Sequence, residues 1–328
     1  LYANRRLQNG GYNIMSNKQT MMENIVNKVI SNMDKHGKDW LKPWASLGMP
    51  KNLSSGKNYR GINTIALWIA KEEFGFTSDI FGTFKQISSK GGKVNKGAKG
   101  TQVIYMQPAL YRNARTNETP DTSDGAVKVQ YNLMRSYFVF NLDQTTGLEE
   151  YQQVQAEGSE TLLDVEQYVK NTGATIKYSS ETLFLKNSCY YVPSQDYIGM
   201  VSKEQFNGND SSSATQNFYA TLLHELTHWT GHKSRCDRTE KYKTKYFENF
   251  GNNEQYAFEE LVAELGACIQ CCMLGITMEP TPHAIQYLKI WKDRIKAKPE
   301  TIFKASALAQ AGVNYIQDLQ PEELKQVS

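Results

Sequence analysis

The first half of the chain repeats its hydrophobic positions at helical spacing in two segments and holds short apolar runs elsewhere. Apolar residues every three or four positions predict helices over 18–33 and 62–74, and apolar runs predict strands over 102–106 and 137–140. Four glycines between Gly91 and Gly100 predict a loop or turns in that stretch.

The second half is predicted to be mainly helical after a group of short strands. The predicted strands span 175–178, 182–185 and 190–192, and the predicted helices span 162–171, 215–230, 256–274, 283–296 and 305–312. Because the strands and helices are segregated and do not alternate, the predicted fold class is α+β.

The length and one polar stretch indicate two domains. A chain of 328 residues is long enough for two domains of roughly 150 residues each. The polar stretch 144–160 contains few apolar residues and lies where a basic half gives way to an acidic half. We therefore predict a tail over 1–15, a first domain over 16–145, a linker over 146–160 and a second domain over 161–328.

Composition excludes several protein classes. No stretch of 18 uncharged apolar residues exists, so we expect no membrane span, and the first residues do not have the pattern of a secretory signal. Three of the five cysteines, Cys268, Cys271 and Cys272, lie in one apolar helix-like run, which is typical of buried thiols and not of a disulfide framework. We expect a cytoplasmic protein.

Charge is distributed unevenly along the chain. Residues 1–110 carry 16 Lys and Arg against 6 Asp and Glu, whereas the remaining residues carry 21 against 28. The segment from Lys85 to Gly100 holds five lysines, four glycines and no acidic residue. Glycines let backbone amides approach a phosphate closely, and lysines supply the charge, so this segment suits a polyanion.

Aromatic residues are interspersed through the same basic half. They are Trp40, Trp44, Tyr59, Trp68, Phe81, Phe84 and Tyr105. Exposed aromatic rings beside basic loops suit single-stranded nucleic acid, because bases stack on the rings while the cations follow the backbone. The alternative is a solvated lysine loop above an aromatic core, and most of these rings must belong to a core in either case.

The strongest chemical signal is the motif His224-Glu225-Leu226-Thr227-His228. Residues four apart lie on one face of a helix, so both imidazoles can reach one Zn²⁺. Glu225 lies one position further round, where it is placed to take a proton from water at the metal. The alternative, two histidines on a solvated surface, fits poorly with the apolar residues that flank the motif.

A third metal ligand must come from elsewhere in the chain. The metzincin spacing requires a histidine at position 234, which is a serine here, and Gly231 is expected to turn His232 away from the site. Two carboxylates four apart on a later apolar helix are the remaining candidates: Glu260 as ligand, with Glu264 orienting a ligating imidazole, or the two roles exchanged. We favour Glu260, and Glu259 fits a solvated face.

The segment from Tyr190 precedes the motif helix and has two interpretations. It suits the edge of a sheet along which an extended peptide is held, although a strand in the core is the simpler interpretation.

Several motifs in both halves match one protein family. They include Gly56-Lys57-x-Tyr59-Arg60-Gly61, Gly91-Gly92-x-Val94-x-Lys96-Gly97-x-Lys99-Gly100, His224-Glu225-Leu226-x-His228-Trp229 and Glu259-Glu260-Leu261-Val262-Ala263-Glu264. In this respect the chain resembles the ArdC-type antirestriction proteins of conjugative plasmids and other mobile elements.

The resemblance implies a function for each half. It implies an N-terminal domain that binds single-stranded DNA and a C-terminal zincin-like metallopeptidase domain whose Glu-x-x-Ala element maps onto Glu260 and Ala263. The candidate DNA-binding residues are Lys57, Arg60, Lys85, Lys93, Lys96 and Lys99. The implied role is to shield incoming DNA from restriction.

We accordingly expect one Zn²⁺ per chain, held by His224, His228 and Glu260, and peptide hydrolysis with Glu225 as the catalytic base. The expected partners are single-stranded DNA and a peptide or protein substrate. Two alternatives remain: a protease that cleaves a DNA-associated host protein, and a DNA-binding module whose zinc is purely structural.

Overall fold

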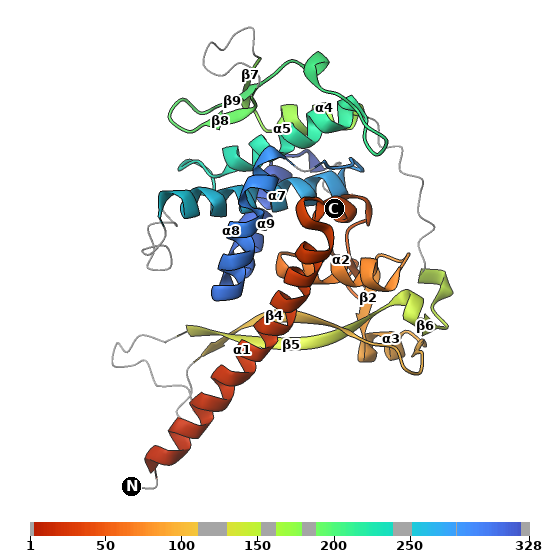
Figure 1. Cartoon of the computed structure of the whole chain (residues 1–328). Helices are drawn as coiled ribbons and strands as arrows, with labels where there is room; N and C mark the ends of the chain where they lie inside the picture. Colours follow the sequence, from red (N-terminus) through yellow and green to blue (C-terminus); the bar gives the residue numbers. More distant parts are fainter. Residues whose placement is uncertain are drawn as a thin grey trace.

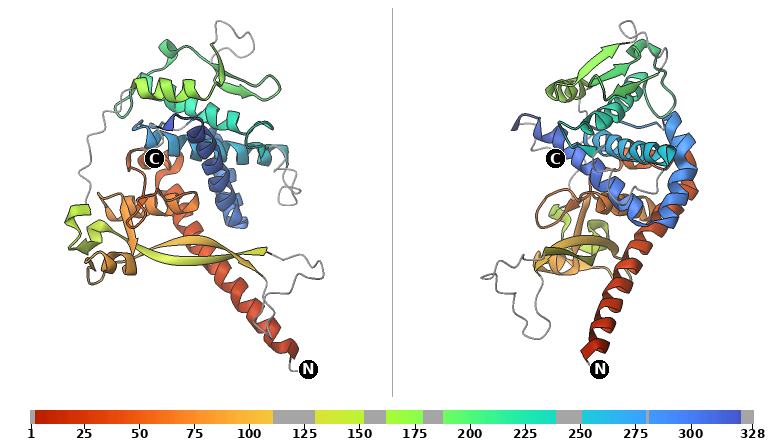
Figure 2. Two further views of the ribbon diagram at one scale, coloured as in Figure 1. Left: turned by 180° about the vertical axis from the view of Figure 1, so that it is seen from behind. Right: turned by 90° about the vertical axis from the view of Figure 1, so that its left-hand side faces the viewer.

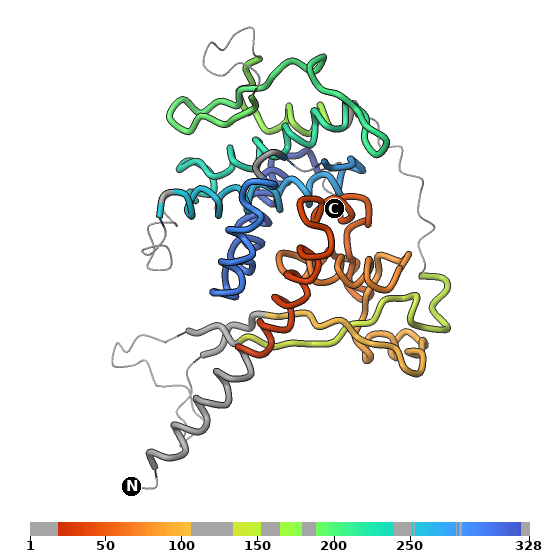
Figure 3. Tube along the Cα trace, viewed as in Figure 1, coloured from red at the N-terminus to blue at the C-terminus, as the bar shows by residue number. Residues whose placement is uncertain are grey.

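The structure is a computed structural model that describes residues 3–110, 130–151, 162–178, 188–238, 251–279 and 281–322. Figure 1 labels its elements, and Figure 3 follows the Cα trace in the same view. Among the described residues, no helix is both long enough and apolar enough to cross a membrane.

The N-terminal half combines helices with a twisted sheet. Its helices are α1 (Ala3–His36), α2 (Ile62–Phe74) and α3 (Phe84–Ser89), and its 3-10 turns are η1 (Gly37–Asp39), η2 (Lys42–Ser46), η3 (Leu142–Gln144) and η4 (Glu149–Tyr151). The strands are β1 (Lys51–Asn52), β2 (Ile80–Thr83), β3 (Lys93–Val94), β4 (Thr101–Leu110), β5 (Gln130–Asn141) and β6 (Thr145–Thr146).

A long antiparallel pair dominates this sheet. Its strand order is β1-β2-β5-β4, and β4 pairs with β5 from Thr101 opposite Val139 to Leu110 opposite Gln130. The short strands β3 and β6 form a separate pair beside α3. The view in Figure 1 shows α1 crossing the β4–β5 ribbon.

The C-terminal half places a small sheet above a group of helices. Its elements are α4 (Leu162–Asn171), β7 (Thr175–Tyr178), β8 (Tyr190–Val192), β9 (Tyr197–Met200), η5 (Lys203–Gln205), α5 (Ala214–Thr230), α7 (Asn252–Met273), α8 (Pro282–Ala297) and α9 (Glu300–Asp318). The strand order β7-β9-β8 leaves β8 at an edge, over α5. Figure 2 shows this sheet and the helices as successive layers.

Close packing of α5 on α7 brings together the two helices that carry the candidate ligands. A Cβ at position 266 would lie 2.4 Å from Cγ2 of Thr227, so only glycine lets the two helices approach this closely. The Nε2 of Gln270 donates to the Thr227 hydroxyl over 2.9 Å and satisfies this buried polar group. The start of α5 is fixed by a capping box between Ser213 and Gln216.

The helical pattern predicted from the sequence is confirmed, and most differences concern where elements end. The predicted helices 62–74 and 162–171 have the observed bounds, whereas α9 extends well beyond the predicted 305–312. The sequence pattern did not predict β1, β2, α3, β6 or β9, and β3 lies inside the predicted glycine-rich loop. The strand predicted over 182–185 lies outside the described residues.

The hydrophobic core runs continuously through both halves of the molecule. One cluster of buried side chains includes residues of α1, α2, α5, α7, α8 and α9. Trp40 packs edge-on against Trp44 at 5.3 Å and also meets Trp291 of α8 at 6.4 Å, measured between ring centroids. Trp44 in turn stacks on Trp68. The two predicted domains are therefore joined by packing as well as by the chain.

We expect Trp44→Ala to lower the free energy of unfolding by about 3–5 kcal/mol, because it removes a fully buried ring from the shared core. Denaturant unfolding followed by circular dichroism would measure this change. Phe84→Ala is the matched control, since 62% of Phe84 is exposed. Equal effects of the two substitutions would contradict a shared core.

Candidate functional site

The two histidines of the motif lie one turn apart on the buried face of α5. Only 2% of His224 is exposed, and Leu222, Leu223 and Leu226 anchor the same helix in the core. The Nε2 atoms of His224 and His228 lie 3.2 Å apart, with the two rings nearly perpendicular. Both imidazoles therefore direct a nitrogen toward one point, as the spacing predicted.

Glu260 of α7 supplies a carboxylate at the same point. Its Oε2 lies 3.3 Å from Nε2 of His224, and its Oε1 lies 3.4 Å from Nε2 of His228. A tetrahedral metal with bonds of about 2.0–2.1 Å needs ligand atoms about 3.3–3.4 Å apart. The three side chains thus have the spacing that a single metal ion requires.

Unsatisfied polar atoms at this point support a metal site. Among the described residues, the buried Oε2 of Glu260 makes no hydrogen bond. Burial alone would lower the pKa of His228, but contacts with Glu259 and Glu260 raise it to about 10. Burial acts against ionised Glu260 as well, and its contacts with the two histidines nevertheless lower its pKa. The carboxylates therefore favour a positive charge at this point, which a metal cation would provide.

Glu259 is a residue whose role the sequence interpretation missed. We expected it on a solvated face, but only 20% of its side chain is exposed, and its Oε1 lies 3.2 Å from Nδ1 of His228. Arg238 donates from Nη2 to the same Oε1 over 2.6 Å. Burial would raise the pKa of Glu259, whereas Arg238 and His228 lower it to about 2.

Arg238 fixes this arrangement from the segment that follows α5. Its guanidinium is fully buried and also donates to the carbonyl of Thr227 and the hydroxyl of Thr230, each over 2.6 Å. The ring of His228 is therefore oriented by Glu259, which Arg238 holds in place.

Glu264 lies beside His224, whereas Glu259 lies beside His228. Its Oε1 is 3.7 Å from Nδ1 of His224, which is too long for a hydrogen bond, and it accepts a hydrogen bond from the Thr281 hydroxyl. Burial raises the pKa of Glu264 despite the nearby His224. Glu264 therefore faces His224 without the hydrogen bond that would orient its ring, while Glu260 lies between the two histidines.

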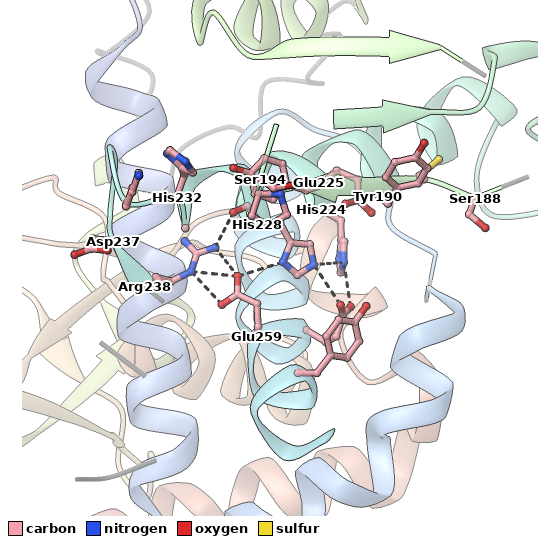
Figure 4. A pocket seen from close by; sticks show the side chains of 17 residues that line it. Ser188, Tyr190, Ser194, His224, Glu225, His228, His232, Asp237, Arg238 and Glu259 are labelled. Atoms are coloured by element: carbon pink, nitrogen blue, oxygen red, sulfur yellow. Dashed lines mark hydrogen bonds and ion pairs between the residues drawn. The ribbon is translucent and has the colours of Figure 1, made fainter. Parts of the chain in front are cut away.

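His224, His228 and Glu260 border a cavity of about 800 Å³. Figure 4 shows Glu225, Tyr190, Ser194 and His232 around the same opening. His232 contacts Ser234 through Nδ1 over 2.8 Å and is not one of the three grouped side chains. The preferred interpretation of 190–192 as a core strand is wrong, because β8 is half-buried, lies at the edge of the sheet formed by the described strands, and contributes Tyr190 and Tyr191 to the cavity.

The predicted DNA-binding residues fall into two groups. Lys85, Lys93, Lys96 and Lys99 are exposed on α3, β3 and the loop that follows β3. Lys57 and Arg60 are also exposed, but they line a second cavity, beside α9.

The aromatic residues divide between the core and the surface. Trp40, Trp44, Trp68 and Phe81 are buried, whereas Phe84 and Tyr105 are exposed. Phe138 is 59% exposed and was missed by the sequence interpretation. Thr83, the last residue of β2, pairs with Val139 of β5. Phe84, the first residue of α3, and Phe138 of β5 are the chain neighbours of that pair, so both rings start near the end of β2.

This fold and this site define a two-domain protein with a zincin-like metallopeptidase domain. Residues 163–308 match the family described as zincin-like metallopeptidase, and residues 19–140 match the N-terminal domain of anti-restriction factor ArdC. The chain belongs to the ArdC-type antirestriction protein family.

A solved relative supports this assignment over nearly the whole chain. The metal-free crystal structure of the antirestriction ArdC protein from plasmid R388 is 33% identical, with a TM-score of 0.73 over 91% of this chain and 97% of that one. The Mn(II)-bound structure of that protein is 32% identical, with a TM-score of 0.69 over the same shares of both chains.

Two curated relatives are much longer than this chain. Both are called DNA primase TraC from Escherichia coli; they are 31% and 32% identical over 94% and 95% of this chain. The chain spans only 28% and 21% of their respective lengths.

We expect Glu260→Gln to weaken metal binding more than Glu264→Gln does. Glu260→Gln removes a carboxylate that lies in direct reach of the metal point. Glu264→Gln changes a residue that only neighbours a ligand, and such residues typically change metal affinity by roughly 10–100-fold. Glu259→Gln belongs with this second class, and Glu204→Gln, on the exposed turn η5, is the control. Competition with a chelator of known affinity would measure each variant, and a larger effect of Glu264→Gln would reverse the assignment.

Proposed function

We propose that this protein binds single-stranded DNA through its N-terminal domain and hydrolyses peptide bonds at a zinc site in its C-terminal domain. Membership of an antirestriction family supports a role in shielding DNA that enters a cell from restriction, in the cytoplasm. The observation that carries the catalytic part is the group His224, His228 and Glu260 at the border of an open cavity that Glu225 also lines.

In this proposal His224, His228 and Glu260 hold one Zn²⁺. Two imidazoles and one carboxylate form a donor set typical of catalytic zinc, and a relative with the same fold has been solved with Mn(II). When bound, the metal supplies Lewis-acid chemistry that polarises a carbonyl group.

The residues of the chain carry out the proton transfers. Glu225 is buried at the cavity, next to His224 in sequence, where its carboxylate takes the proton of the attacking water. It then delivers that proton to the departing amine, so that the peptide bond breaks without a net change in the enzyme. Among the described strands β8 lies at the edge of its sheet, and its backbone groups can pair with an extended peptide.

The size of the cavity favours catalysis over a purely structural metal. A structural zinc is closed off by four protein ligands, whereas a catalytic zinc keeps one position open. Here the described residues bring three ligands together, and the point they share adjoins a cavity of about 800 Å³. A protein substrate associated with DNA is compatible with the same site.

The exposed rings and lysines support DNA binding by the N-terminal domain. Phe84 and Phe138 offer faces on which bases can stack. Lys85 follows Phe84 in the sequence. Lys99 precedes Gly100, which packs closely against Phe138: a Cβ added at Gly100 would lie 3.0 Å from Cβ of Phe138. Lys93 and Lys96 extend the positive surface along the chain.

We expect Glu225→Gln to retain the metal and to abolish hydrolysis, because the change removes the proton acceptor and leaves the ligands intact. Mass spectrometry of a mixed peptide library would detect cleavage, and elemental analysis would measure the metal. Glu204→Gln is the control. Cleavage by the Glu225 variant at the wild-type rate would contradict the catalytic role.

We expect replacement of Lys93, Lys96 and Lys99 by Ala to reduce the salt dependence of oligonucleotide binding. Three lost phosphate contacts would change the log–log slope by about 2, at roughly 0.7 per contact on a single strand. Fluorescence anisotropy with the whole chain would measure this slope, because the shared core argues against isolating one domain.

The matched control for this experiment replaces three exposed lysines of the C-terminal half, Lys170, Lys289 and Lys296. An unchanged slope in the first variant, or an equal change in the control, would contradict a DNA path over the lysine-rich loop.

A further inference from the structure

A second cavity, of about 380 Å³, lies where the turn before α2 meets α9. The backbone N–H of Gly61 donates to Oε1 of Gln310 over 3.1 Å and ties this turn to α9. Gly61 has a φ of +57°, a backbone conformation that favours glycine. The walls of the cavity therefore come from both halves of the molecule.

The cavity has a cationic side. Lys57 and Arg60 line it, are exposed to solvent, and form no ion pair with another described residue. Asn314 lines the cavity from α9 and accepts a hydrogen bond through Oδ1 from Nε2 of Gln310 over 3.0 Å. This bond occupies its oxygen and leaves its amide N–H groups as donors. Two cations and amide donors are suited to a phosphate group.

The remaining lining is suited to a nucleobase. Oδ1 of Asn58 is a buried acceptor without a hydrogen bond among the described residues. The amide of Gln317 lines the cavity and also contacts the hydroxyl of Tyr168, and the carboxylate of Asp318 is a further acceptor. Buried acceptors need donors, and the amino and imino groups of a base provide them. Met49, Met273 and Val313 add apolar surface for the ring.

We propose that this cavity binds one nucleotide unit, with its phosphate toward Lys57 and Arg60 and its base toward Asn58 and Gln317. A simple anion would leave the buried acceptor of Asn58 unsatisfied. The volume lies near the lower end of the range for ligand pockets and suits one such unit. The inference rests on the proposed DNA binding and adds the C-terminal helix α9 to the DNA-contacting surface.

Two substitutions test the cavity in the whole chain. Asn314→Asp keeps the acceptor for Gln310 and puts a negative charge in place of amide donors, and Arg60→Gln removes a cation. The controls make the same changes in charge at exposed positions outside the cavity, Asn207→Asp and Lys170→Gln. Binding of dAMP is measured by calorimetry, and binding of a single-stranded oligodeoxyadenylate by fluorescence anisotropy.

We expect both cavity variants to bind the oligonucleotide about tenfold more weakly than their controls, a change of about 1.4 kcal/mol. Saturable binding of dAMP that both variants lose would show that a free nucleotide also occupies the cavity. Weaker oligonucleotide binding without any dAMP binding would assign the cavity to a nucleotide within the strand.

The remaining outcomes separate this inference from the proposed function. If the wild type binds the oligonucleotide and both cavity variants bind it as their controls do, the inference is wrong while DNA binding stands. If the wild type binds dAMP in the cavity but no oligonucleotide, the cavity stands and the proposed DNA binding fails. Binding of neither probe overturns both.

Discussion

The burial of three carboxylates on one helix is the constraint on which the rest of the site depends. Glu259, Glu260 and Glu264 of α7 lie inside the protein, where an ionised group without a partner is strongly destabilising. Each carboxylate faces a specific partner: Glu259 faces His228 and Arg238, Glu260 lies between both histidines, and Glu264 contacts Thr281 and approaches His224. These partners come from α5, from the segment after it that holds Arg238, and from Thr281 before α8. The carboxylates therefore fix how these parts of the chain pack on α7.

The same helix also connects the two halves of the molecule. Beyond the carboxylates, the thiol of Cys268 lies 3.6 Å from the carbonyl oxygen of Leu41, and Met273 reaches the cavity that Lys57 and Arg60 line. The rings of Trp40, which follows η1, and of tryptophans in η2, α2 and α8 fill the space between the halves. A change in packing at one end of α7 would therefore shift side chains at the other end, since closely packed interiors transmit displacement.

Periodicity predicted the elements that obey it and missed those that do not. The helices α2 and α4 and the motif on α5 follow from apolar spacing, and the histidine pair follows from the helical turn. The strand β9 was missed because all four of its residues are buried, so no alternation marks it. Glu259 was misassigned because its partner Arg238 lies in a segment without a regular pattern. Spacing also could not place Lys57 and Arg60 at a cavity, because the opposite wall of that cavity belongs to α9, far away in the sequence.

In the proposed site His224, His228 and Glu260 together hold one zinc ion. X-ray absorption at the zinc edge of the purified, zinc-loaded chain tests this most directly, because it reports the type and distance of the ligand atoms. We expect one zinc per chain with two imidazole nitrogens and a carboxylate oxygen at about 2.0–2.2 Å and no sulfur ligand. Sulfur at about 2.3 Å, or an unchanged spectrum in a chain with His224→Ala and His228→Ala, would contradict it.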